Sequence, residues 1–370
     1  MRKPALFSGF LALCACGPLA AAQYSIIEIP QLTHAAGLND NGDVVGDKLF
    51  YQHTSGVVNR FSDAFSLDGI NDHGQIIGTA LLGSPTAPSG IQANVWLVSG
   101  GEKRLGNGVE LSQGMAINNS GRAVGSIGDF HAQSHAVLWR LKDNSTTELG
   151  TLVVNDVDGF IFDPGSQANA INVQDDVVGW SDALIFDTGG NPIEAATHAF
   201  RWHNGVMTDL GTLPGSAFSV ANGINDNGEV VGVSDIASGA FHAFLYRRGR
   251  MVDLGDLAND PKLNSQADGI NDRGEIVGWS EVRLTADNSI AQRAFVYSSG
   301  KMLNLTFQIE RKSPLFGKVR LTEATAINCK GWIAADGFDV TNLQDHAYLL
   351  IPRGAERKDC PRRRHVDREE

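Results

Sequence analysis

A ten-residue sequence that recurs seven times constrains the fold of this chain more than any other feature. Its fullest form reads Gly-Ile-Asn-Asp-x-Gly-x-Val-Val-Gly, and its asparagines are Asn39, Asn71, Asn118, Asn172, Asn225, Asn271 and Asn328. Self-similarity at periods of tens of residues is typical of propellers, solenoids and other repeat arrays. A residue present in every copy is expected to build the repeat, so the pattern predicts architecture and says little about chemistry.

Each repeat contains four short apolar stretches that are separated by turns and lack helical spacing. In the fifth copy these stretches are 219–224, 229–233, 242–246 and 251–254. The first turn begins with Asn and has Gly three residues later, which predicts a type I turn with a Gly bulge between antiparallel strands. Four-stranded units that repeat radially form a β-propeller.

The two ends of the chain complement each other. The last repeat lacks a fourth stretch, whereas residues 24–29 form a stretch that has no first three. We therefore predict an all-β propeller of seven four-stranded blades, in which the N-terminal strand pairs into the last blade and closes the ring. A β-solenoid, which needs no such closure, is the alternative. The spacing of 32 residues from Asn39 to Asn71 is short for four strands and leaves open a reduced first blade.

The start of the chain predicts export. Residues 1–22 combine a basic opening, an apolar run and three alanines before the cleavage point, which is the pattern of a secretory signal peptide. The alternative is a lipoprotein anchored at Cys16. Residues 23–352 are expected to form a single propeller domain, and residues 353–370 a charged, disordered tail. The expected location is the periplasm or the extracellular space.

Cysteine usage is consistent with an oxidising compartment. Apart from the two cysteines of the signal sequence, the chain contains only Cys329 and Cys360. We expect these two to form a disulfide that ties the tail to the last repeat, the alternative being two unpaired thiols.

The charge balance excludes some partners. The chain has 42 acidic and 30 basic residues, a formal net charge of −12. An acidic protein lacks the basic footprint that nucleic acids require, and it is not attracted to anionic membrane surfaces. The expected partners are therefore an extracellular or envelope protein, or a glycan.

Two more motifs accompany the repeat. The third stretch contains His-Ala-Phe at His198 and at His242, and the fourth contains Asp-Leu-Gly-Thr-Leu at Asp209 and Asp-Leu-Gly at Asp253. This combination resembles the HAF-repeat family of bacterial extracellular repeat proteins. The first two repeats depart from the pattern, because they have no His-Ala-Phe. The resemblance implies an exported repeat protein, and it implies neither a reaction nor catalytic residues.

Loop lengths indicate which face of the propeller carries function. The turns after the first and third stretches are short, whereas the loops after the second and fourth stretches are long and varied. Strand direction places both long classes at one end of the ring, which we call the long-loop end. Functional residues tend to lie on variable loops of a rigid scaffold, so this end is the candidate site.

The residue three before each repeat asparagine varies while its neighbours repeat. It is expected on the innermost strand near the central channel, where four of these residues could bind a ligand: Asp68, Asn169, Asn222 and Asp268. The alternative is that they hydrogen-bond to neighbouring blades. The histidines of His-Ala-Phe recur in several blades and are expected to be structural, because a catalytic base is needed only once. His34 and His131, which are not part of that motif, are weaker candidates at the long-loop end.

A metal site is only weakly indicated. Asp156, Asp158 and Asp163 place three carboxylates in one long loop, and calcium prefers six to eight oxygen ligands. The full pattern of a calcium-binding loop is absent, so no cofactor is expected other than this calcium possibility. The chain also contains no Gly-x-Ser-x-Gly, His-Glu-x-x-His or phosphate-loop motif.

The sequence thus favours an exported, non-enzymatic binding or scaffold protein that holds a partner or a glycan at its long-loop end. The alternative is a hydrolase or lyase that acts on an extracellular polysaccharide. In that case Asp68 and Asp268 are the expected acid pair, with carboxyl groups roughly 5 to 9.5 Å apart.

Overall fold

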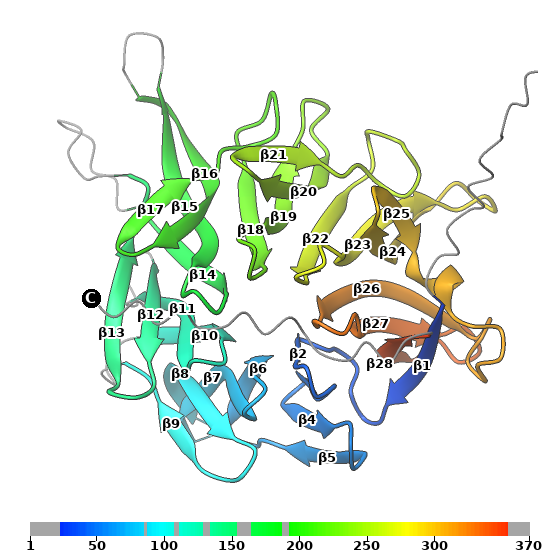
Figure 1. Ribbon diagram of the computed structural model, residues 1–370, viewed down its shortest axis with the longest axis horizontal. Coiled ribbons are helices and arrows are strands. Elements are labelled where there is room, and N and C mark those ends of the chain that lie inside the picture. Colours follow the sequence, from blue (N-terminus) through cyan, green and yellow to red (C-terminus); the bar gives the residue numbers. More distant parts are fainter. Residues whose placement is uncertain are drawn as a thin grey trace, which may run out of the picture.

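The computed structural model describes residues 23–84, 87–106, 111–128, 134–153, 164–186 and 192–353. Seven antiparallel sheets of four strands each are arranged in a ring (Figure 1), which confirms the predicted β-propeller and excludes a solenoid. No helix in the described part of the chain is long and apolar enough to cross a membrane.

The strands occupy four concentric positions in the blades. The innermost strands are β2 (Gly37–Leu38), β6 (Ala64–Ile70), β10 (Leu111–Ile117), β14 (Ser166–Ile171), β18 (Ser219–Ile224), β22 (Ser265–Ile270) and β26 (Val319–Ile327). The second strands are β3 (Val44–Gly46), β7 (Gln75–Ser84), β11 (Arg122–Gly128), β15 (Val177–Phe186), β19 (Val230–Asp235), β23 (Ile276–Arg283) and β27 (Ile333–Asp339).

The third and fourth positions complete each blade. The third strands are β4 (Leu49–Gln52), β8 (Ala87–Leu97), β12 (His135–Arg140), β16 (Pro192–His203), β20 (Phe241–Arg247), β24 (Ile290–Ser298) and β28 (Asp345–Pro352). The outermost strands are β5 (Val57–Arg60), β9 (Glu102–Arg104), β13 (Ser145–Gly150), β17 (Val206–Asp209), β21 (Arg250–Asp253), β25 (Lys301–Asn304) and β1 (Tyr24–Ile29). A short 3-10 helix, η1 (Leu305–Gln308), follows β25. The first blade is therefore complete, although its strands are short.

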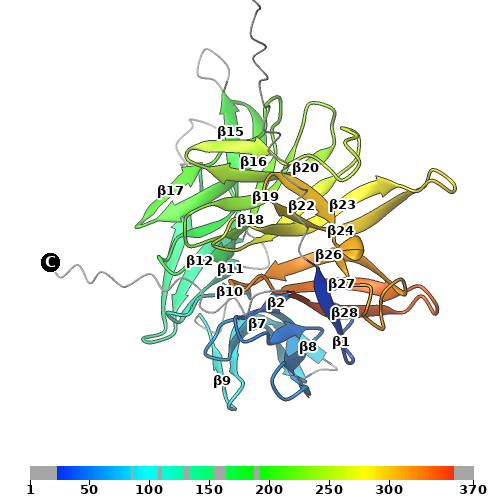
Figure 2. The same cartoon turned by 45° about the vertical axis from the view of Figure 1, so that its right-hand side comes forward.

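The N-terminal strand closes the ring as predicted. β1 is the outermost strand of the last sheet and pairs with β28 from Tyr24 opposite Pro352 to Ile29 opposite Ala347. The dark-blue β1 lies beside β28 in both views (Figure 1, Figure 2). Closure thus joins the two ends of the described chain within one blade.

The core consists of seven hydrophobic clusters, one at each boundary between neighbouring blades of the described structure. Both valines of the repeat contribute, because successive strand residues point to opposite faces of a sheet. Val177 packs in the cluster shared with the preceding blade, and Val178 in the cluster shared with the following one. The Val-Val pair of the repeat therefore serves two interfaces at once.

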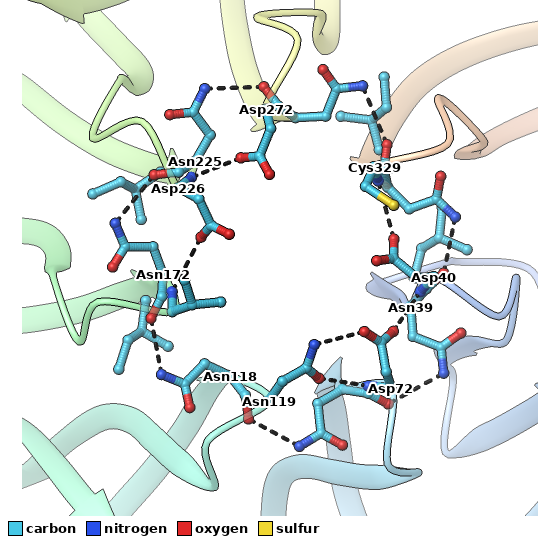
Figure 3. Close-up of a pocket in the computed structure, with 18 of the residues that line it drawn as sticks. Asn39, Asp40, Asp72, Asn118, Asn119, Asn172, Asn225, Asp226, Asp272 and Cys329 are labelled. Carbon is cyan, nitrogen blue, oxygen red and sulfur yellow. Dashed lines mark hydrogen bonds between the residues drawn. The ribbon is translucent and has the colours of Figure 1, made fainter. Parts of the chain in front are cut away.

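The repeat asparagines form a closed ring of hydrogen bonds at the end of the channel built from the first-to-second turns, which we call the short-turn end (Figure 3). Asn225 Oδ1 accepts from the backbone N–H groups of Asn227 (3.0 Å) and Glu229 (2.9 Å), and Gly228 has a φ of 75°. These contacts confirm the predicted turn. Each Nδ2 donates to the carbonyl oxygen of the next repeat asparagine, in the order 39, 71, 118, 172, 225, 271, 328 and back to 39.

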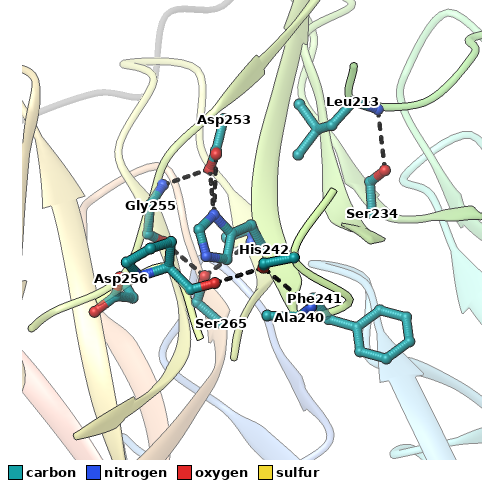
Figure 4. A network of polar contacts seen from close by, with 12 residues as sticks. Leu213, Ser234, Ala240, Phe241, His242, Asp253, Gly255, Asp256 and Ser265 are labelled. Carbon is teal, nitrogen blue, oxygen red and sulfur yellow. Dashed lines mark hydrogen bonds and ion pairs between the residues drawn. The ribbon is translucent and has the colours of Figure 1, made fainter. Parts of the chain in front are cut away.

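The His-Ala-Phe and Asp-Leu-Gly motifs are explained by one polar network (Figure 4). His242 Nδ1 lies 2.9 Å from the carboxylate of Asp253, which also accepts from the Gly255 N–H (2.7 Å). The Ala243 N–H donates to Ser265 Oγ of the next blade (2.9 Å), and this hydroxyl donates to the Gly255 carbonyl (2.6 Å). Equivalent histidine–carboxylate pairs are His198–Asp209 and His346–Glu28. In these blades the motif histidine makes a structural contact, as predicted.

Candidate functional site

The innermost strands share an irregularity of strand pairing, and this irregularity determines where their side chains point. In six blades the pairing between the first and second strands skips one residue: Asp68, Met115, Asn169, Asn222, Asp268 and Thr325. These six residues each lie three before a repeat asparagine, and we call this place the bulge position. The strands β6 and β26 each contain a second irregularity, at Phe65 and at Thr322. A β-bulge leaves its extra residue unpaired and redirects its side chain.

The last glycine of the repeat sits opposite this bulge. A Cβ atom at Gly232 would overlap the carbonyl oxygen of Val220 and lie 2.9 Å from Ala221 Cα, immediately before the bulge residue Asn222. The same obstruction occurs at Gly125, Gly179 and Gly278. Glycine is therefore required on the second strand because the bulged backbone approaches it closely.

All seven residues of this place, including Ala36 of the first blade, line one cavity of about 320 Å³ in the channel. Its other lining residues are His34, Ala35 and Glu323. We call this cavity the channel pocket. His34 and Ala35 belong to the loop between β1 and β2, so the pocket lies toward the long-loop end. The predicted residues Asp68, Asn169, Asn222 and Asp268 are thus brought together around the channel.

The two asparagines and the two aspartates of this set make different contacts. Asn169 Nδ2 donates to the Ala221 carbonyl of the next blade (2.9 Å), and Asn222 Nδ2 donates to Ala267 in the same way (3.0 Å). These are the inter-blade hydrogen bonds that the sequence analysis left as the alternative. Asp68 instead accepts from Ser66 Oγ (2.7 Å), and Asp268 accepts from Gln266 Nε2 (2.7 Å), each on its own strand.

The acids of the channel pocket are held in an unfavourable environment for negative charge. Burial raises the pKa of Asp68 to about 6. Burial, and then the nearby carboxylate of Glu323, raise the pKa of Asp268 well above its usual range. Burial and the neighbouring Asp336 likewise raise the pKa of Glu323. Asp268 Oδ2 is buried and has no hydrogen-bond partner among the described residues. These carboxyl groups would be stabilised by a donor or a positive charge in the pocket.

One imidazole faces this group of acids. His34 Nδ1 lies 2.5 Å from Asp336 Oδ2, and this hydrogen bond raises the pKa of His34. The Ala35 N–H donates to Asp336 Oδ1 (2.8 Å), while the His34 N–H donates to Asp47 (2.8 Å). Carboxylates of the last and first blades therefore pin the loop that carries His34.

Glu323 and Asp336 are not among the residues predicted from the sequence, and His34 is predicted only as a candidate at the long-loop end. A usable signal exists for two of them, because His34 and Glu323 both lie five residues before a repeat asparagine. Residues at this place and at the bulge position contact each other, as Ser66–Asp68 and Gln266–Asp268 show. Asp336 has no such signal, since its role depends on a loop that is remote in sequence.

The short-turn end carries a second group of acids. Residues after the repeat asparagines form a partial second belt, in which the Asp40 N–H donates to Asp72 Oδ1 (2.8 Å) and the Asp226 N–H to Asp272 Oδ1 (2.8 Å). Burial, and then the charge of Asp72, raise the pKa of Asp40 to about 6. No group of three or more acidic, histidine or cysteine side chains within the described ranges is arranged to hold a metal ion.

Several expectations fall outside the described residues. These are the calcium loop with Asp156, Asp158 and Asp163, the candidate His131, the signal peptide with Cys16, and nearly all of the tail. Cys329 is disulfide-bonded. Its expected partner, Cys360, lies outside the described part of the chain, so the predicted pairing stays a prediction.

The fold and the channel together define this protein as a seven-bladed β-propeller. No protein-family model matches the chain, and no curated protein sequence matches it. Solved structures are similar in fold. The β-propeller domain of the Trilobed protease from Pyrococcus furiosus has a TM-score of 0.53 at 8% identity, covering 91% of this chain and 100% of that one. That domain is described as having an open velcro topology, whereas β1 closes the last sheet here.

Two further solved structures allow comparison of the fold. The acylaminoacyl peptidase from Pyrococcus horikoshii has a TM-score of 0.52 at 12% identity, covering 90% of this chain and 52% of that one. An ulvan lyase has a TM-score of 0.45 at 10% identity, covering 90% and 96%. At such identities the two structures with TM-scores above 0.5 support the propeller fold and establish no activity.

Proposed function

We propose that this protein is an exported, non-enzymatic binding protein whose channel pocket, at the long-loop end, holds a ligand. The observation that carries the proposal is the convergence of the bulge-position residues, His34 and Glu323 on one cavity. Bulges in six blades redirect side chains into the channel, and the residue types there differ from blade to blade. A concave pocket with a few convergent polar groups is the default location of a binding site.

Export and the HAF-repeat resemblance support the same proposal from the sequence. The signal-peptide pattern of residues 1–22 is typical of an exported protein, whose partners would be a glycan or an envelope protein. The HAF-repeat resemblance rests on the His-Ala-Phe and Asp-Leu-Gly motifs themselves, and in the fifth blade these motifs meet in one polar network.

Thermal melting against a panel of oligosaccharides and divalent cations tests the proposal. A ligand that binds only the folded protein raises the melting temperature by mass action. We expect at least one oligosaccharide class to raise it, and we expect Asp268→Asn to abolish the rise. If the rise survives this substitution, binding is located elsewhere and the channel pocket is not the site.

The pairing of His34 with Asp336 favours a second candidate, an enzyme that acts on an extracellular polysaccharide. A carboxyl group with a raised pKa can donate a proton near neutral pH, and Asp68 is such a group beside an imidazole. Incubation with polysaccharides, followed by assays for new reducing ends and for unsaturated sugars, detects hydrolysis and elimination. Turnover that Asp68→Asn and Asp268→Asn both abolish would support the enzyme, and its absence would remove this candidate.

A further inference from the structure

The channel pocket presents several acceptor atoms, and some of its donors are already used in bonds between blades. The side-chain amides of Asn169 and Asn222 each donate one hydrogen bond from Nδ2 to the next blade, and their Oδ1 atoms are available to accept. Thr325 Oγ1 donates to the Ala334 carbonyl (3.4 Å), which leaves its lone pairs as acceptors. Asp268 Oδ2 is buried without a partner in the described structure. A ligand that brings donors would satisfy these acceptors.

The charged groups of the pocket also favour a ligand that carries positive charge and donors. The pocket and its rim contain the carboxyl groups of Asp68, Asp268, Glu323 and Asp336, whereas no Lys or Arg is among the described lining residues. The single imidazole, that of His34, is already paired with Asp336. A positive ligand would therefore reduce repulsion among the remaining carboxyl groups.

The size and spread of the site exclude a bare metal ion. Calcium requires six to eight oxygens at about 2.3–2.6 Å, which is a compact cluster. Here the acids come from three blades around a cavity of about 320 Å³, and the described residues contain no metal-holding group. The cavity has the dimensions of a small organic molecule rather than an ion.

We propose that the channel pocket binds a small organic cation with N–H donors, a primary ammonium or a guanidinium, and that Asp268 is its principal acceptor. This inference rests on the proposed binding function and specifies its ligand class. The cation would donate to Asp268 Oδ2 and to the free amide oxygens of Asn169 and Asn222. Charge-assisted hydrogen bonds of this kind are the strongest available to such a ligand.

Calorimetric titration with matched probes tests the ligand class. Glucosamine and 1,4-diaminobutane carry N–H donors and positive charge, tetramethylammonium carries charge without donors, and glucose carries donors without charge. We expect the two amines to bind at least about tenfold more tightly than the other two probes. Equal affinity for tetramethylammonium, or no affinity for any amine, would overturn the inference.

Asp268→Asn separates a ligand-binding role from a structural one. We expect at least about tenfold weaker binding of the amines, because the charged acceptor is lost. The melting temperature should stay the same or rise, because asparagine at the bulge position donates to the next blade, as Asn222 does to Ala267. A fall in melting temperature with unchanged affinity would instead show that Asp268 is structural.

Asp272→Asn is the matched control at the other end of the channel. It removes the same charge as Asp268→Asn. Asparagine already stands at this place in the third repeat, where Asn119 Oδ1 accepts from the Asp72 N–H (2.9 Å), so the substitution is expected to be tolerated. Amine affinity should be unchanged in this variant. Glu323→Gln provides a second variant inside the pocket, with an expected loss of affinity in the same direction as Asp268→Asn.

Proton release gives an independent readout. A cation that binds next to partly protonated carboxyl groups displaces protons, so the heat of binding at pH 6 should depend on the ionisation enthalpy of the buffer. Binding without proton release would contradict a contact with Asp68 or Asp268.

If neutral oligosaccharides raise the melting temperature in an Asp268-dependent manner while amines do not bind, the proposed function stands and the cation inference fails. If no probe of either kind binds, both fail.

Discussion

At the short-turn end of the channel every repeat asparagine donates to the next blade and accepts from its own turn, so the ring of hydrogen bonds closes on itself. At the long-loop end the same innermost strands bulge, and their residues differ from blade to blade. Asn169 and Asn222 reach the next blade, whereas Asp68 and Asp268 bond only along their own strands. One repeat therefore builds a ring of hydrogen bonds that is the same in every blade at one end of the channel, and a set of side chains that differs from blade to blade at the other.

The largest loss of stability is expected from substitution of the glycine that faces a bulge. Gly232→Ala places a Cβ against the Val220 carbonyl and Ala221 Cα, so the bulged strand must move. We expect a loss of about 4 kcal/mol of stability, which places it among the severe substitutions. Thermal melting checks this. Gly249→Ala, at an open position with a φ of 74°, isolates the cost of left-handed backbone and should lose only about 1 kcal/mol.

A smaller loss is expected from opening the asparagine ring. Asn225→Ala removes two bonds to its own turn, one to the Asn271 carbonyl (3.0 Å) and one to Glu229 Oε2 (2.9 Å), and it leaves buried groups without partners. We expect about 3 kcal/mol of destabilisation, measured by melting temperature. The neighbouring Asn227→Ala removes one exposed bond to the Asp272 carbonyl and serves as the control, with less than about 1 kcal/mol. Similar losses in both variants would mean that the ring contributes little.

Each end of the channel has an acid whose pKa is raised to about 6, Asp68 at the long-loop end and Asp40 at the short-turn end, so a substitution is needed to isolate the contribution of Asp68. Burial raises the pKa of Asp68 to about 6, although Ser66 and His34 act in the opposite direction. The folded protein thus keeps this proton at pH values where the unfolded chain, with a pKa of about 3.9, has released it. Stability contributed by Asp68 therefore falls as the pH rises from about 4 to about 6 and changes little above that.

Asp68→Asn removes this titration. Relative to the unsubstituted protein, the variant should gain about 2 kcal/mol of stability across that pH window, as determined from melting curves at several pH values. Asp143→Asn is a control with the opposite sign, because hydrogen bonds from Ser145 lower the pKa of the exposed Asp143. A pH-independent difference between Asp68→Asn and the unsubstituted protein would show that Asp68 is not buried as described.

The fold was predictable because its signals are local and repeated. Turn chemistry at each Asn-x-x-Gly, the alternating aliphatic pairs and the complementary ends of the chain led to seven blades and to closure by residues 24–29. The bulge was not predictable, because the glycine that permits it at Gly232 looks the same in sequence as any strand glycine. Only the three-dimensional pairing shows that one residue is skipped on the facing strand.

The candidate site was predictable in part. Variation within a constant frame directed attention to Asp68 and Asp268, and the structure places both in the lining of the channel pocket. Their surroundings could not be read from the sequence, because the charge of Glu323 acts on Asp268 from the next blade, and Asp336 reaches His34 through ring closure. His34 meets Asp336 across 302 positions, a distance over which a single sequence carries no pattern.

Closure by β1 also bears on how the protein folds. The first described strand must find β28, and the hydrogen bond from Ser25 to Ile351 spans 326 positions. Contacts of such long sequence separation form slowly, so the last blade is expected to assemble late. Until then β1 is an unpaired edge that can add to a strand of another chain. Slow pairing of β1 with β28 would therefore prolong the time in which the chain can associate with another copy.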